Sequence, residues 1–161
     1  MAYLERGPQS GACFLCLAHA DAGTSPDLVV WRGRSVFALL NAYPYANGHV
    51  MVAPYAHEAD LDAVAEPVAV ELMSAVRLAI GALRIAYDPE GFNVGANLGS
   101  AAGAGLGAHL HLHVVPRWSG DTNFMTSTGN TRVLPEALDD TARRLRAAIE
   151  RESEPRSEEP S

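Results

Sequence analysis

The chain has 161 residues, of which 48% are hydrophobic, and a formal net charge of -7 at pH 7, which suits one domain with a core of ordinary size. An acidic chain with scattered arginines argues against broad nucleic-acid binding, which needs a basic stripe. All 12 basic residues are arginines, so the lack of lysine excludes a P-loop lysine and Schiff-base chemistry.

The sequence also predicts a cellular location and a redox environment. No apolar run approaches the roughly 20 residues that a membrane-spanning helix needs, and residues 1–11 lack the basic and then apolar pattern of a signal peptide. We therefore expect a cytoplasmic protein without a membrane partner. Cys13 and Cys16 form a Cys-x-x-Cys pair, which in a reducing compartment indicates a metal or redox site rather than a structural disulfide.

The first part of the chain is predicted to be rich in strands. Residues 1–12 are expected to form a flexible arm. Runs of strand-forming residues lie at 28–32, 35–40, 49–53 and 92–96. Gly33 and Arg34 between the first two runs predict a two-residue hairpin turn, and Pro54 ends the third run or places it at an edge.

Two stretches have helical periodicity. Between residues 60 and 86 apolar residues recur every three or four positions, which predicts an amphipathic helix starting near Pro67. A final helix is predicted from Pro135 to Ile149, and the acidic tail at 151–161 has too few apolar groups to become ordered. We therefore expect one α+β domain over 13–150, with an antiparallel sheet, one long helix and one C-terminal helix.

Histidines alternate with apolar residues in the stretch 109–115. In an extended chain successive side chains point to opposite faces, so His109, His111 and His113 are expected to share one face of a strand. Half of the six histidines of the chain lie in this row. The row is therefore interpreted as a functional site rather than as a half-exposed strand that carries histidines by chance.

Three imidazoles on one strand face permit two kinds of chemistry. They can bind zinc and leave an open position for an activated water, or one can act as a nucleophile while the others orient it and stabilise a phosphate. The glycine-rich segment 97–108 precedes the row and contains no carboxylate. Glycines let backbone N–H groups approach an anion, which favours the phosphate interpretation, although a plain flexible connection is the alternative.

The row His109-Leu-His-Leu-His-Val-Val115 resembles the signature of the histidine triad (HIT) superfamily of nucleotidyl hydrolases and transferases. The resemblance continues in Phe37–Pro44 and in Asn47–Pro54, which are similar to two central strands of that family and their connection. It covers Cys13 to Trp118, and the segment 115–124 resembles the diadenosine tetraphosphate phosphorylase branch. It implies a HIT-like antiparallel sheet and a homodimer or higher homo-oligomer.

The resemblance implies catalytic roles for four histidines. His111 would be the nucleophile that attacks the α-phosphorus and forms a nucleotidyl-histidine intermediate. His113 would hold phosphate oxygens, and the backbone of His109 would accept a bond that fixes the tautomer of His111. His49 matches a fourth histidine, which orients the others from the neighbouring strand.

The resemblance also implies residues that bind the nucleoside and the phosphates. Asn41 lies where the family binds ribose hydroxyls, and we expect the adenine pocket near Phe14 and Leu39. On the phosphate side the expected residues are Asn97, Ala104, Gly105 and Trp118. Ala104 and Gly105 replace the glutamine of the hydrolases in a loop one residue longer, so phosphate contacts there would depend on backbone groups. Trp118 is expected to border the phosphate pocket or the dimer neighbour.

A structural zinc site is implied by the same resemblance, and no organic cofactor is expected. In several branches of the superfamily a Cys-x-x-Cys pair and two histidines hold the metal. Here the set would be Cys13, Cys16, His57 and His109, which has the composition of a tetrahedral Cys2His2 site. His19 is a nearby competitor for the role of His57.

The expected reaction is the cleavage of diadenosine tetraphosphate through an adenylyl-histidine, with inorganic phosphate as acceptor and ATP and ADP as products. Within the superfamily the alternatives are a dinucleoside polyphosphate hydrolase and an adenosine phosphoramidase. Outside it, the alternatives are a zinc hydrolase with the three histidines as ligands and a nucleotide-binding regulatory module. An adenine nucleotide and phosphate are therefore the expected partners.

Overall fold

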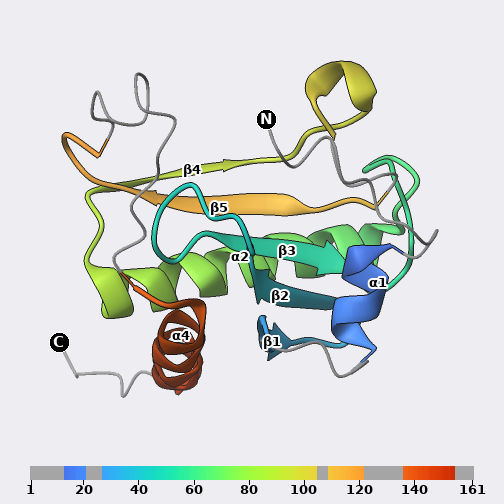
Figure 1. The fold of residues 1–161 in the computed structure, drawn as a ribbon. Helices are drawn as coiled ribbons and strands as arrows, with labels where there is room; N and C mark the ends of the chain where they lie inside the picture. Colours follow the sequence, from blue (N-terminus) through green and yellow to red (C-terminus); the bar gives the residue numbers. More distant parts are fainter. Residues whose placement is uncertain (1–12, 21–26, 105–108, 122–135, 155–161) are drawn as a thin grey trace, which may run out of the picture.

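A computed structural model describes residues 13–20, 27–104, 109–121 and 136–154. Its centre is a five-stranded sheet with the order β1-β2-β3-β5-β4 (Figure 1). The strands are β1 (Val29–Arg32), β2 (Val36–Leu40), β3 (Val50–Pro54), β4 (Gly91–Gly95) and β5 (Leu112–Arg117). All neighbouring strands are antiparallel, so the α+β fold class with a strand-rich antiparallel sheet is confirmed.

In the described residues, four helical segments accompany the sheet. They are α1 (Phe14–His19), the short 3-10 helix η1 (Ser100–Ala102), the long helix α2 (Glu66–Tyr87) and the C-terminal helix α4 (Leu138–Ser153). Proline in the first turn of α2 agrees with the predicted start near Pro67, because proline is tolerated where the amide needs no helical partner. Asp88 ends the helix in the left-handed conformation. Within the described ranges, the helices are too short or too polar to cross a bilayer.

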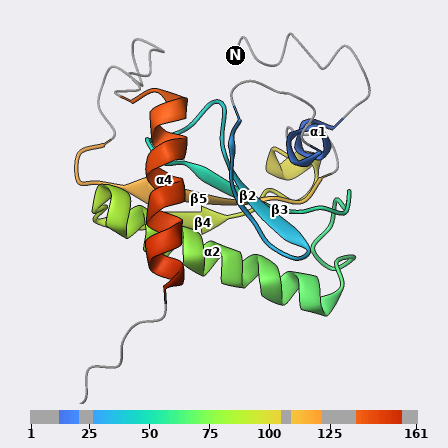
Figure 2. The ribbon, with the colours of Figure 1, turned by 90° about the horizontal axis from the view of Figure 1, so that it is seen from below.

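The two faces of the sheet are packed differently. Alternate residues of the central strands, among them Ala38, Val52 and Val114, lie in the main core with α2. Leu72 and Leu83 of α2 are almost fully buried in this core, and each contributes about 1.5–3 kcal/mol by burial. Figure 2 shows α4 crossing α2 on this side, where both helices contribute to the core.

A smaller cluster lies on the opposite face of the sheet. It joins Leu15 and Ala18 of α1 to Phe37, Leu39 and Met51 of the central strands. Residues on this face alternate with those that pack on α2, as the pairings Phe37↔Ala53 and Leu39↔Met51 require. This face and the end of the sheet near α1 carry the candidate site.

Several local expectations were wrong. The helix α1 was not expected, because six residues are too few for a helical period. The hairpin turn lies one residue later than predicted, at Arg34 and Ser35, since the Gly33 amide bonds the Val36 carbonyl. The carboxylate of Glu71 accepts bonds from the Arg34 and Ser35 amides and so holds the turn on α2.

The chain around the histidine row also differs from the expectation. Strand β5 begins only at Leu112, so His109 and His111 precede the strand instead of lying in it. The reason is that the Leu110 amide bonds the Glu58 carbonyl at 2.5 Å, outside the sheet ladder. At the other end, α4 continues to Ser153, beyond the boundary expected at 150. The predicted arm at 1–12 lies outside the described residues.

Candidate active site and metal cluster

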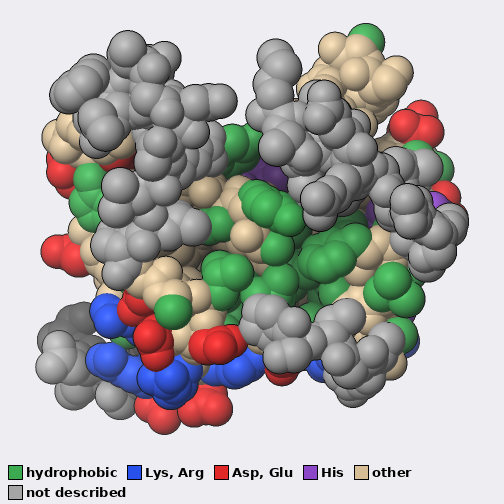
Figure 3. All heavy atoms as spheres, in the orientation of Figure 1, with side chains coloured by type: hydrophobic (Ala, Val, Ile, Leu, Met, Phe, Trp, Pro, Cys, Tyr) green, Lys and Arg blue, Asp and Glu red, His purple; other side chains and the backbone are tan. Residues whose placement is uncertain are grey.

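Four imidazoles form a continuous row on the sheet face opposite α2. His113 pairs with Met51 of β3 and therefore points to the face of the smaller cluster. His49 Nε2 lies 2.9 Å from His113 Nδ1. The ring centroids of His113 and His111 are 4.9 Å apart. His111 Nδ1 lies 2.9 Å from the carbonyl oxygen of His109. In the view of Figure 3, histidine side chains are visible beside apolar side chains on this face.

The hydrogen bonds of His49 determine where its proton lies and, through it, the proton of His113. The Tyr45 amide donates to His49 Nδ1 at 3.1 Å, so that nitrogen carries no proton. The neutral ring then carries its proton on Nε2 and donates it to His113 Nδ1. His113 is consequently protonated on Nε2, which makes it a hydrogen-bond donor at the remaining nitrogen.

The opposite tautomer is imposed on His111. Its Nδ1–H donates to the His109 carbonyl, so the neutral ring has its lone pair on Nε2. His111 is 7% exposed. Burial, with a smaller effect from His111, lowers the pKa of His113. The site therefore places a basic nitrogen of His111 beside an N–H donor of His113.

His109 joins this row to a second group of side chains. Its Nε2–H donates to the Pro54 carbonyl at 2.9 Å, which leaves Nδ1 unprotonated. That nitrogen lies 3.4 Å from Cys13 Sγ and 3.5 Å from Cys16 Sγ. Burial lowers the pKa of His109, against the opposing effect of the Pro54 bond. A neutral imidazole with a free Nδ1 is the form that binds a metal.

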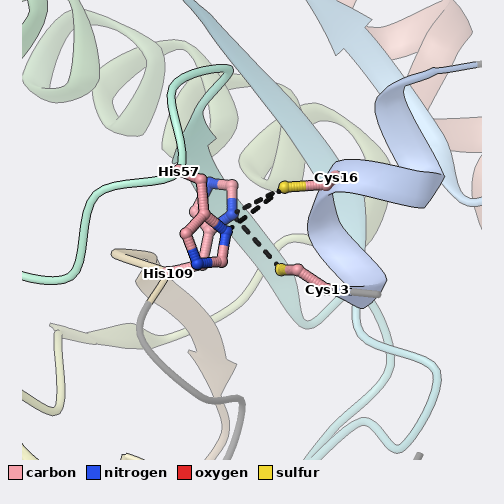
Figure 4. Close-up of side chains that lie close together, drawn as sticks. All are labelled: Cys13, Cys16, His57 and His109. Carbon is pink, nitrogen blue, oxygen red and sulfur yellow. Dashed lines mark hydrogen bonds between the residues drawn. The ribbon is translucent and has the colours of Figure 1, made fainter. Parts of the chain in front are cut away.

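The second group, here called the metal cluster, consists of Cys13, Cys16, His57 and His109. Their ligand atoms all lie within 4.8 Å of one another, and Cys16 Sγ is 3.3 Å from His57 Nδ1. Figure 4 shows the two thiols of the α1 region facing the two imidazoles. Zn–S bonds of about 2.3 Å and Zn–N bonds of about 2.0 Å give a tetrahedral S···N edge of about 3.5 Å, and the S···N separations of 3.4, 3.3 and 3.5 Å fit that edge.

The competing ligand His19 lies elsewhere. Its ring contacts Phe37 and Tyr55, with centroid separations of 5.3 Å and 5.1 Å. This imidazole therefore packs against Phe37 and Tyr55, while His57 reaches the thiols. The geometry selects His57 as the fourth member of the metal cluster.

The expected nucleoside-binding residues lie in different environments. Asn41 follows β2, and its Oδ1 accepts the Tyr43 amide at 2.9 Å, which directs the carbonyl oxygen to the loop. Leu39 is fully buried beneath α1. Phe14 is half-buried and packs against both hydrophobic clusters, so it is the member of this pair that reaches the surface.

The expected phosphate-binding residues are only partly accounted for. Asn97 is exposed, and its amide donates to the Gly103 carbonyl at 3.4 Å. The Ala104 amide, expected to be available to phosphate, instead bonds the Gly99 carbonyl at 3.3 Å. Trp118 is half-buried just after β5, and its amide bonds Asp121. Gly105 lies outside the described residues.

Two contributors to the site were missed from the sequence. The Tyr45 ring stacks on His49 at 5.1 Å with an interplanar angle of 19°, in addition to the amide bond. The Glu58 carbonyl holds the Leu110 amide. The signal for Tyr45 was its place four residues before His49 across the Asn47-Gly48 turn, whereas a backbone carbonyl such as that of Glu58 leaves no signal in residue type.

Known proteins resemble this chain in sequence. The HIT domain family matches residues 22–120. A Mycobacterium tuberculosis protein named AP-4-A phosphorylase is 47% identical over 118 residues, which are 73% of this chain and 60% of the relative. The match thus spans about three fifths of that relative's length.

Solved structures resemble the fold over most of its length. A Zn-bound histidine triad family protein from Mycobacterium smegmatis has a TM-score of 0.70 and 26% identity, covering 87% of this chain and 94% of the other. A hypothetical histidine triad nucleotide-binding protein from Sulfolobus tokodaii has a TM-score of 0.72 and 26% identity, covering 86% and 93%. With the family match over most of the sheet and its row of imidazoles, the chain belongs to the HIT domain family.

Proposed function

We propose that this protein is a nucleotidyl transferase that cleaves diadenosine tetraphosphate and transfers the adenylyl group to inorganic phosphate. The observation that carries the proposal is the hydrogen bonding of two neighbouring rings, which implies a lone pair on His111 Nε2 and an N–H on His113 Nε2. The 47% identity to a protein named AP-4-A phosphorylase supports the choice of substrate.

In the first step, His111 Nε2 attacks the α-phosphorus. The bond from this phosphorus to the bridging oxygen breaks, and the electron pair leaves with ATP. The ring of the adenylyl-histidine is cationic because Nδ1 keeps its proton, and the His109 carbonyl stabilises that charge by accepting the Nδ1–H bond. The Nε2–H of His113 donates to an oxygen of the phosphate group as negative charge develops.

In the second step, an oxygen of inorganic phosphate attacks the same phosphorus. The P–N bond breaks, its electron pair returns to His111 Nε2, and ADP is released. Two displacements at one site replace a single displacement between two large anions, and they allow the acceptor to enter after ATP has left.

The test is incubation with diadenosine tetraphosphate, with and without ³²P-labelled phosphate. The expected products are unlabelled ATP and ADP that carries the label on its β-phosphorus, formed only when phosphate is present. AMP and ATP formed equally in both samples would contradict transfer to phosphate and indicate the hydrolase alternative. The variant His111→Asn controls for contaminating activity.

The alternative of a three-histidine zinc hydrolase receives no support. Such a site needs three imidazole nitrogens that converge on one metal. Both ring nitrogens of His109 are directed elsewhere, one to Pro54 and one to the thiols. The nitrogen of His113 nearest to His49 is also engaged.

We also propose that zinc occupies the metal cluster. The donor set of two thiolates and two neutral imidazoles is typical of structural zinc, and a histidine triad protein of similar fold is Zn-bound. When bound, zinc supplies bonds that link α1, the segment after β3 and the segment before β5. Elemental analysis is expected to find zinc equimolar with the chain. A zinc-binding titration is expected to show that His57→Ala lowers the affinity for zinc at least about tenfold.

A homodimer is proposed as the assembly, in the cytoplasm. The edge strand β4 supports this assembly, because Asn93, Val94 and Gly95 are exposed. In the described part of the chain β5 is the strand that pairs with β4. The outer edge of β4 is therefore available to another chain. Light scattering is expected to give twice the chain mass.

A further inference from the structure

The nucleophile is not held by the sheet. Strand β5 begins at Leu112, and its last pairing with β3 is Leu112 with Val52. His111 precedes this pairing, so the ladder does not fix its backbone on the amino-terminal side. The direct anchor of its imidazole is the His109 carbonyl. The placement of His111 Nε2 therefore depends on what holds residues 109 and 110.

Three polar contacts hold this short segment, and the Leu110 side chain is buried in the main core. The Leu110 amide bonds the Glu58 carbonyl at 2.5 Å, and His109 Nε2–H bonds the Pro54 carbonyl at 2.9 Å. The third contact is that of His109 Nδ1 with the thiols of the metal cluster. His57, the exposed member of the cluster, is the neighbour of Glu58 in sequence. The metal cluster thus holds the 109–110 segment through His109. Through His57 it also holds the segment whose Glu58 carbonyl bonds Leu110.

The metal cluster lies outside the main core. The core between the sheet and α2 contains none of the four ligands, and Cys13 only borders the smaller cluster. The hydrophobic packing that forms the sheet is therefore independent of the cluster. Losing the metal is expected to free the His109 ring and the segment at residues 55–58 without unfolding the domain, because Leu110 stays packed in the main core.

We propose that Cys13, Cys16 and His57 are positioning residues for the nucleophile, acting through His109. Binding of the metal fixes the His109 ring, the ring and its backbone fix the carbonyl, and the carbonyl fixes the His111 ring with its lone pair on Nε2. The inference rests on the proposed transfer chemistry, and it extends the cluster from a structural role to the control of kcat.

The test compares three variants with the wild-type protein. His57→Ala removes an exposed ligand whose ring contacts that of His109, with centroids 5.0 Å apart. His57→Cys restores a zinc-binding side chain at the same position. His19→Ala is the matched control, because it removes an imidazole from α1 that packs on Phe37 and not on the cluster.

Two measurements report on positioning, and a third reports on the fold. Steady-state kinetics separate kcat from KM, and ¹⁵N NMR of the ring nitrogens at a fixed alkaline pH reports the tautomer of His111, assigned by comparison with His111→Asn. Circular dichroism reports whether the sheet and helices persist. Zinc content is measured on the same samples.

For His57→Ala we expect zinc loss, a fall in kcat of about 10–100-fold with little change in KM, and mixed tautomers of His111 in a folded protein. His57→Cys should recover zinc, kcat and the single tautomer, and His19→Ala should retain all three. A folded, zinc-free His57→Ala protein with wild-type kcat and a single His111 tautomer would overturn the inference. So would global unfolding of this variant, because the sheet is expected to persist.

The nitrogen spectra keep this inference separate from the proposed function. If the wild-type protein does not cleave diadenosine tetraphosphate, the proposed function is wrong. The metal dependence of the His111 tautomer can still be measured on the same protein. If the wild-type enzyme is active and the His111 tautomer is the same with and without zinc, only the positioning inference is wrong.

Discussion

The two ends of the imidazole row are held in opposite ways. At one end, His49 is fully buried and is bonded by the amide of Tyr45, four residues earlier in the chain. At the other end, His109 is bonded by side chains from distant parts of the chain, including Cys13, 96 residues away. The first end is held by local backbone within the packed sheet, and the second is held by a cluster at its margin.

This difference teaches what each end contributes. His49 cannot be replaced by a smaller side chain without opening a cavity and leaving polar groups without partners, so the geometry of this end is part of the stability of the fold. The other end is held by the side chains of the cluster, none of which belongs to the main core. Substitutions at the two ends should therefore separate stability from catalysis.

The largest effect is expected at the centre of the row. His111→Ala should lower kcat/KM at least about 1,000-fold, because the nucleophile is removed and both steps depend on it. The unfolding free energy should change far less than the activity. Initial rates with labelled phosphate measure the loss, and residual activity within tenfold of wild type would show that another group is the nucleophile.

At the buried end, His49→Ala should reduce both stability and activity. The variant loses a fully buried ring and leaves the Tyr45 amide and His113 Nδ1 without their partner. We expect a loss of about 2–4 kcal/mol in the free energy of unfolding. Urea denaturation measures it, with His57→Ala as the comparison. Equal destabilisation by the two variants would remove the distinction between the ends.

The pH dependence of stability is expected to follow His113 and His109, because burial lowers the pKa of both imidazoles. Burial lowers the pKa of His113 in the folded protein, so the unfolded chain binds its proton more readily. The free energy of unfolding should therefore be fully present above the unfolded pKa of about 6.5 and should decrease as the pH falls below it. Urea denaturation across this range, with His113→Gln as the control, should show a shallower decrease for the variant.

The smallest effect is expected for the ring that covers His49. Tyr45→Ala removes a stacked ring but keeps the backbone amide, so kcat should fall by roughly 2- to 10-fold, as the loss of one aromatic contact implies. Tyr45→Phe should retain wild-type kcat. Tyr43→Ala is the matched control, since Tyr43 is similarly exposed, at 66% against 62%. A larger loss for Tyr43→Ala than for Tyr45→Ala would indicate that stacking on His49 is not the reason.

The sequence predicted the sheet well because strand periodicity and turn residues are local signals. The long helix was recognised from its apolar repeat, and Pro67 indicated its first turn. The alternation around His111 placed the imidazoles near the correct strand but could not indicate where the ladder ends. That boundary depends on the Glu58 carbonyl, which takes the Leu110 amide.

The candidate site was predicted less evenly. The grouping of His57 with the cysteines followed from the family resemblance, and the cluster geometry agrees with it. The bond of Asn41 to its own loop and the engagement of the Ala104 amide depend on backbone conformation. Residue type alone cannot reveal such bonds, because the same side chain or amide is equally available for a ligand in the unfolded chain.

The three bonds of His109 have a consequence for how such a chain can evolve. One nitrogen bonds Pro54, the other faces the thiols, and the backbone carbonyl bonds His111. The carbonyl is present whatever the side chain, so position 109 tolerates replacement only where another contact keeps the backbone in place. A descendant that lost the cysteines would first have to acquire another contact that holds the backbone at position 109. The order of the substitutions is therefore constrained as well as their identity.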